Sequence, residues 1–82
     1  MTRVVVPVAL RPLTGGEEQV EVQARDVRGL VRALDRRFPG FARSLGDGFA
    51  VAIDGEILQD PWLEPVPEEG ELHFLPALAG GC

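Results

Sequence analysis

The stretch Asp26–Gly40, DVRGLVRALDRRFPG, decides the fold. Its apolar residues recur at spacings of three and four and therefore share one face of a helix; they are Val27, Leu30, Val31, Leu34 and Phe38. Asp26 is a favourable N-cap, and Pro39-Gly40 ends the pattern. We predict a helix from Val27 to Phe38.

Segments of strand character precede this helix. Arg3–Leu10, RVVVPVAL, is rich in β-branched residues, and Gln19–Ala24, QVEVQA, alternates apolar and polar side chains. A turn at Gly15-Gly16 joins the two segments in a predicted hairpin. Pro7 cannot donate a ladder hydrogen bond, so we expect a local irregularity there.

More strands follow the helix. After a loop containing LGDG, Phe49–Leu58, FAVAIDGEIL, predicts a second hairpin with its turn at Asp54-Gly55. Gln59–Gly70, QDPWLEPVPEEG, is rich in proline and predicts a structured loop with a short helical turn at Trp62 and Leu63. A last strand, Glu71–Pro76, leads into the end of the sequence.

The order strand, strand, helix, strand, strand, strand favours an α+β fold of the β-grasp kind. Such a fold has a mixed sheet of about five strands with one main helix across one face. A chain of 82 residues is long enough for one core only. We therefore expect one β-grasp domain over residues 1–82, with a flexible C-terminal tail over 77–82.

The composition excludes several classes of protein. Hydrophobic residues make up 45% of the chain and charged residues 26%, a balance typical of soluble globular proteins. The net charge of −5 argues against nucleic-acid binding, which needs a dense cationic surface. No apolar run approaches the ~20 residues that span a bilayer, no leader pattern opens the sequence, and one cysteine cannot form an internal disulfide. We therefore expect a cytoplasmic protein with no membrane partner.

The final residues, Leu75–Cys82, read LPALAGGC. Glycine lets another backbone approach closely, so Gly80-Gly81 suits a tail that threads an enzyme's active site. The residues from Leu78 onward reach at most about 17 Å beyond the folded body, which is enough to enter such a site. A frayed end is the alternative reading of the glycine pair.

In this context the chain resembles the ubiquitin-like sulfur carriers of the MoaD/ThiS family. The resemblance lies in VRGLVRALDRRFPGF, VAIDGEIL and GELHFLPALAGG and covers nearly the whole length. It implies that an E1-like enzyme adenylates Gly81 with ATP, that Gly81 then receives sulfur as a thiocarboxylate, and that Gly80 gives steric access. It also implies that Leu75, Pro76 and Leu78 dock against partner enzymes, and it implies no bound cofactor.

Cys82 departs from the family pattern, because a typical carrier ends on the glycine. The resemblance suggests that a JAMM-type zinc metalloprotease removes Cys82, and GGC also mimics a carrier with cysteine joined after its glycines. Two other readings stay open: Cys82 carries a persulfide on its own thiol, or it is a passive terminal residue.

Other candidate residues favour surface roles. His73 is the only histidine and lies in an alternating strand, so we interpret it as a sheet-surface residue or docking contact and predict no metal site. Arg28, Arg32 and Arg36 form an i, i+4, i+8 row that is either a solvated face or a contact for an acidic partner. No pairing of nucleophile and base stands out, so we expect a protein substrate of enzymes rather than an enzyme.

Three functional hypotheses follow. The first is a sulfur carrier that supplies the biosynthesis of cysteine, a cofactor or a thio-natural product through a sulfur-accepting enzyme. The second is the small subunit of molybdopterin synthase. The third is a ubiquitin-like module whose open sheet face binds a partner without covalent chemistry.

Overall fold

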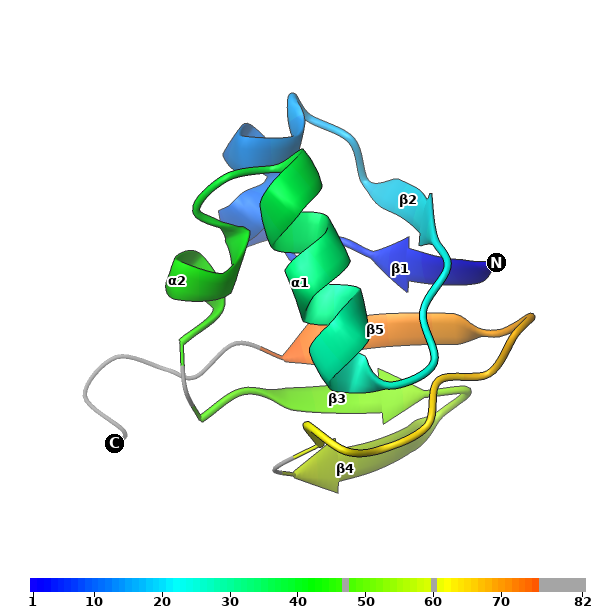
Figure 1. Cartoon of the computed structure of the whole chain (residues 1–82). Coiled ribbons are helices and arrows are strands. Elements are labelled where there is room, and N and C mark those ends of the chain that lie inside the picture. The colour runs from blue at the N-terminus through cyan, green and yellow to red at the C-terminus, as the bar shows by residue number, and fades with distance from the viewer. Residues whose placement is uncertain (47, 60, 76–82) are drawn as a thin grey trace.

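The computed structural model describes residues 1–46, 48–59 and 61–75. In chain order the elements are β1 (Thr2–Val5), the 3₁₀ helix η1 (Val8–Thr14), β2 (Gln19–Val22), α1 (Val27–Arg37), α2 (Phe41–Leu45), β3 (Ala50–Ile53), β4 (Glu56–Gln59) and β5 (Glu71–Leu75). The strands form one sheet, and α1 crosses one side of it with α2 and η1 nearby (Figure 1). None of the helices in this part of the chain is long and apolar enough to cross a membrane.

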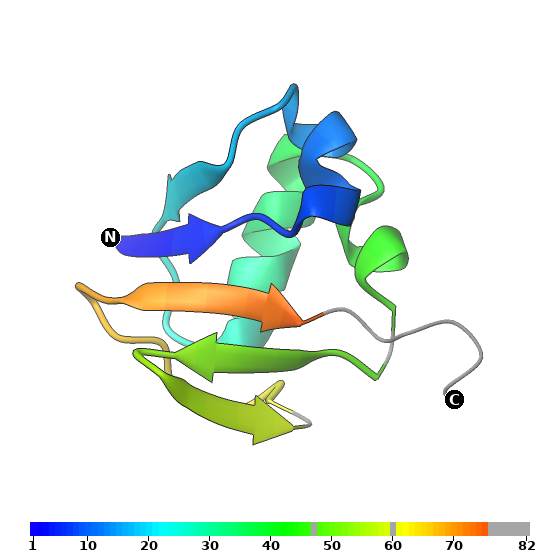
Figure 2. The ribbon, with the colours of Figure 1, turned by 180° about the vertical axis from the view of Figure 1, so that it is seen from behind.

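The sheet is mixed, and the last of its strands in sequence lies at its centre. The strand order is β2-β1-β5-β3-β4, in which β5 runs parallel to β1 and antiparallel to β3. Neither α1 nor α2 covers the opposite side of the sheet (Figure 2). The predicted mixed sheet of five strands with one main helix across one face is confirmed.

The core fills the space between α1 and the sheet. The predicted apolar face of α1 is buried, with Phe38 half-buried at its end. Phe74 of β5 lies within this core, and its ring contacts those of Phe41 and Phe49 edge-on, with centroids 5.7 and 5.8 Å away. Burying side chains of this size contributes about 1.5–3 kcal/mol each, which makes the contact between helix and sheet the main source of stability.

Two kinds of contact hold the start of α1. The Asp26 side chain accepts a hydrogen bond from the Gly29 N–H at 2.8 Å, which confirms the predicted N-cap. The N–H groups of the first two helical residues donate to the carbonyls of Glu64 and Trp62, at 3.0 Å each. The proline-rich loop therefore satisfies donors that a helix start otherwise leaves unpaired.

The first strand is shorter than predicted. β1 ends at Val5, and the last residues assigned to it from the sequence, 8–10, belong to η1. Pro7 explains the change: it brings no N–H to a ladder, and its carbonyl accepts the Leu10 N–H at 2.9 Å to begin the 3₁₀ turn. Gly15 and Gly16 do form a turn with positive φ, but it joins η1 to β2 rather than two strands directly.

A second helix follows α1 where the sequence analysis expected only a loop. α2 buries Phe41 and Leu45, which are four residues apart, and its Ala42 N–H donates to the Asp35 carboxylate at 3.1 Å. A helix this short depends on tertiary contacts for its stability, so local patterning gives little sign of it.

The second hairpin is confirmed. Asp54 and Gly55 have φ values of 49° and 92°, as a type I′ turn requires. Asp54 also fixes the start of β5, because its Oδ1 accepts the Glu71 N–H and its own N–H donates to the Glu71 carbonyl, each at 3.0 Å. The predicted turn at Trp62 and Leu63 is present, closed by the Glu64 N–H on the Pro61 carbonyl at 2.9 Å.

Replacing Asp54 tests this double role. Asp54→Ala removes the acceptor for the Glu71 N–H and strains a positive φ, so we expect a loss of about 1–3 kcal/mol in the free energy of unfolding. Asp54→Asn keeps an oxygen acceptor and tolerates the same φ, so we expect a change within about 0.5 kcal/mol. Urea denaturation measures both; equal losses would contradict this account.

Candidate functional site

The structure describes two of the residues predicted for the site, His73 and Leu75, and both lie on β5. The other predicted site residues lie outside the described residues; they are Pro76, Leu78, Gly80, Gly81 and Cys82. The expected tail over 77–82 lies there too. The described part of the site is therefore the strand that leads into the Gly-Gly segment and the surface beside it.

Alternation along β5 separates an anchoring face from a free one. Leu72 and Phe74 are buried in the core, whereas Glu71 and His73 are half-buried and Leu75 is exposed. Successive side chains of a strand point to opposite sides, so Glu71, His73 and Leu75 share the side that none of the described helices covers. The predicted placement of His73 on a sheet surface is confirmed.

The strand register places an apolar row around His73. His73 pairs with Val5 of β1 and with Ala52 of β3, and Ala52 pairs with Ile57 of β4. We name the surface formed by these four residues and Leu75 the open sheet face. Ile57 is 64% exposed and Leu75 is 40% exposed, so this face presents apolar side chains to solvent.

A shallow hollow of about 420 Å³ lies within this face. Ala52, Asp54, Gly55, Ile57, Glu71, His73 and Leu75 line it. Apolar surface with a polar rim is typical of protein-binding sites. Ile57 and Ala52 were not predicted as part of the site, because period-two alternation puts each of them on the uncovered side of its strand but does not show which strands neighbour β5.

Contacts with Glu71 fix the polar edge of the face. His73 Nε2 lies 2.8 Å from Glu71 Oε1, and Arg3 Nη1 lies 3.7 Å from Glu71 Oε2. Among the described residues no group of three or more His, Cys, Asp or Glu side chains could hold a metal ion. The His73 imidazole is hydrogen-bonded to Glu71.

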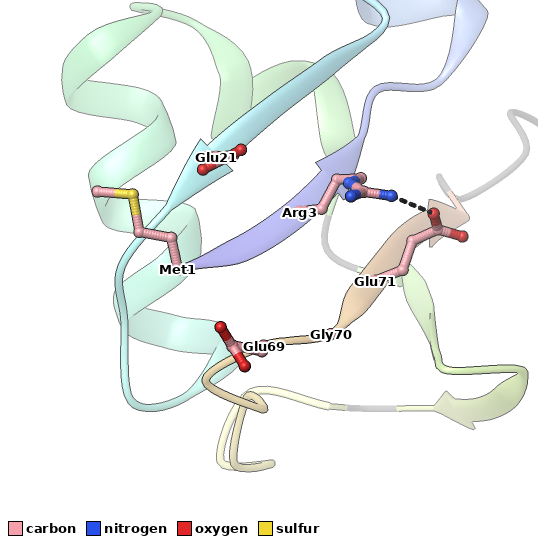
Figure 3. A pocket seen from close by; sticks show the side chains of 6 residues that line it. All are labelled: Met1, Arg3, Glu21, Glu69, Gly70 and Glu71. Carbon is pink, nitrogen blue, oxygen red and sulfur yellow. Dashed lines mark ion pairs between the residues drawn. The ribbon is translucent and has the colours of Figure 1, made fainter.

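A second hollow lies at the opposite end of β5 (Figure 3). It is lined by Met1, Arg3, Glu21, Glu69, Gly70 and Glu71, and Arg3 reaches toward Glu71 across it. It is polar and lies near the start of β5, whereas the Gly-Gly segment follows the end of that strand. We therefore place the candidate site on the open sheet face and the chain beyond Leu75.

Solved structures with the same architecture are known. The chain is 27% identical to a chain of the Amycolatopsis orientalis BexX/CysO complex, with a TM-score of 0.84 over 99% of this chain and 100% of that one. Mycobacterium tuberculosis CysO is 18% identical, with a TM-score of 0.83 over 95% and 100%. A Pyrococcus furiosus protein described as molybdopterin converting factor subunit 1 is 24% identical, with a TM-score of 0.68 over 94% and 97%. The fold is that of a ubiquitin-like β-grasp protein.

The ThiS family model matches residues 4–81. The chain therefore belongs to the ThiS family of MoaD/ThiS-type ubiquitin-like sulfur carriers. Such small carrier proteins are in general not catalysts. Comparison of the sequence with curated proteins gave no match.

Neighbouring residues of β5 provide a test of its two faces. Phe74→Ala leaves a cavity beside the rings of Phe41 and Phe49, so we expect a loss of about 3–5 kcal/mol in the free energy of unfolding. Leu75→Thr keeps strand propensity at an exposed position, so we expect a change within about 0.5 kcal/mol. Urea denaturation compares them. A large loss for Leu75→Thr would show that Leu75 serves the core and not the free face.

Proposed function

We propose that this chain is a sulfur carrier in which Gly81 bears the sulfur as a thiocarboxylate. The observation that supports it most is the extent of the family match, which runs through Gly81 and stops before Cys82. Gly80 supports it as well, because a residue without a side chain leaves room for an enzyme around the reacting carbonyl.

The chemistry begins at the peptide bond between Gly81 and Cys82. Water cleaves this bond, and a JAMM-type zinc metalloprotease is the proposed catalyst. The freed Gly81 carboxylate attacks the α-phosphate of ATP in an E1-like enzyme, which gives an acyl adenylate and releases pyrophosphate. Sulfide then displaces AMP, and the thiocarboxylate passes its sulfur to an acceptor enzyme. The carrier itself binds no cofactor, because ATP belongs to the activating enzyme.

The open sheet face is the proposed docking surface for these enzymes. Leu75 lies on that face, and the six residue steps from Leu75 to Gly81 span at most about 22 Å when extended. An enzyme that holds the apolar row beside His73 can therefore reach Gly81 within the same complex. The relative in the BexX/CysO complex supports a protein partner for this carrier.

Two alternative functions are a subunit of molybdopterin synthase and a binding module without covalent chemistry. The described role of the Pyrococcus furiosus relative favours a small subunit of molybdopterin synthase, whose tail stays inserted in a catalytic subunit. Cys82 makes this alternative weaker, because it occupies the Gly81 carboxyl in a peptide bond. The exposed apolar row favours a module that binds partners without covalent chemistry.

Mass analysis tests the sulfur-carrier proposal. In the organism that encodes the chain, we expect a species that ends at Gly81 and shows one exchange of oxygen for sulfur. Gly81→Val places a branched side chain beside the reacting carbonyl and should abolish that species. As control, deletion of Gly80–Cys82 should also abolish sulfur loading while partner binding through the sheet persists. Only unmodified full-length chain in the cell would contradict the proposal.

A charge on the open sheet face tests the docking step. Ile57→Asp introduces a carboxylate at a 64% exposed position, so the fold should tolerate it while partner binding and adenylation fall by about tenfold or more. Leu63→Asp is the matched control, because Leu63 is 79% exposed and lies outside that face. Calorimetric titration with the activating enzyme measures both; equal effects would contradict docking at the sheet.

A further inference from the structure

A groove on the helical side of the molecule is distinct from the candidate site. We name it the helix groove; it has a volume of about 590 Å³ and is lined by Arg28, Val31, Arg32, Asp35 and Arg36 of α1, Ala42 of α2, and Trp62. α1 and α2 lie on the side of the sheet opposite the open sheet face (Figures 1 and 2). A protein bound to the sheet face therefore leaves the helix groove accessible.

The groove concentrates positive charge on an acidic protein. Arg28, Arg32 and Arg36 are all exposed and follow one another along α1 at a rise of about 6 Å. Like charges at this spacing destabilise a helix, so the row carries a cost. The ion pairs found among the described residues involve other basic groups and none of these three. The net charge of the chain is −5, so this row is a positively charged patch on a negatively charged protein.

Rigid apolar surface accompanies the charge. The Trp62 ring packs edge-on against Phe49 with centroids 4.8 Å apart, and the Trp62 backbone carbonyl accepts the Arg28 N–H at 3.0 Å. Both contacts fix Trp62 at the groove before anything binds, which lowers the entropic cost of binding. Tryptophan and arginine are also the residues that most often dominate the energetics of protein interfaces.

We propose that the helix groove binds an acidic segment of a partner protein. Carboxylates of that segment pair with Arg28, Arg32 and Arg36, and an apolar side chain between them packs against Trp62 and Ala42. Guanidinium groups bind carboxylates in a bidentate manner, which gives direction as well as attraction. This interaction is independent of Gly81 and of its chemistry.

Trp62 is the only tryptophan of the chain, so its fluorescence reports on the groove. The probe is a synthetic helical peptide with Glu at i, i+4 and i+8 and Leu at adjacent positions. Titration of this peptide into the full chain should change Trp62 emission with saturation, and added salt should weaken binding because it screens the ion pairs. The same peptide with Gln in place of Glu should bind at least about tenfold more weakly.

Matched variants locate the interaction. Arg32→Gln should weaken binding about threefold to tenfold. Arg3→Gln removes one positive charge as well, but Arg3 lies in β1 and does not line the helix groove. The affinity of this variant for the peptide should therefore stay within about twofold of the parent's. Circular dichroism checks that both remain folded.

Three results would overturn the proposal. The first is a Trp62 emission that does not saturate as peptide is added. The second is equal affinity for the Glu and the Gln peptide, and the third is an equal loss of affinity in Arg32→Gln and Arg3→Gln. Sedimentation equilibrium adds a fourth: a dimer that Arg32→Gln dissociates would make a second copy of the chain the occupant.

Discussion

Pairing of β5 on both of its sides is the constraint on which the rest of the structure depends. The strand is held by β1 and β3 together, and Leu72 and Phe74 are buried at 0% and 3% exposure. An edge strand with one ladder would separate more easily when a partner acts on the chain that follows it. β5 immediately precedes the segment that contains Gly80-Gly81. A partner that pulls on that segment therefore pulls on a strand that is hydrogen-bonded on both sides.

The proline-rich loop makes this arrangement possible. It must carry the chain from the edge strand β4 to the start of the central strand β5, and it is tied down on the way. The Glu64 and Trp62 carbonyls accept donors at the start of α1, and the Gly70 carbonyl accepts the Arg3 N–H of β1 at 2.9 Å. The same loop therefore orients α1, begins β5 and places Trp62 at the helix groove.

How much the sequence could predict depended on how local each signal is. The apolar face of α1, its Asp26 cap and the Asp54-Gly55 turn each act within a few residues, and they were predicted correctly. The irregularity at Pro7 was also predicted from that residue, but the 3₁₀ helix η1 that follows it was not. α2 was missed because its buried Phe41 packs against Phe74, which is distant in the sequence. The free face of β5 follows from alternation alone, but its neighbours Ala52 and Ile57 follow from register between strands, which no single segment encodes. The proposed role of Gly81 rests on the family pattern, because that residue lies outside the described part of the chain.

A carrier that is loaded by one protein and unloaded by another has to be released between the two. If both partners competed for a single apolar face, tight binding to the first would slow transfer to the second. The open sheet face and the helix groove differ in chemistry and lie on opposite sides of the sheet. The sheet face is apolar around His73, whereas the helix groove is lined by three arginines and Trp62. Under our two proposals, a second protein can therefore recognise the carrier through charge while the sheet face is still occupied.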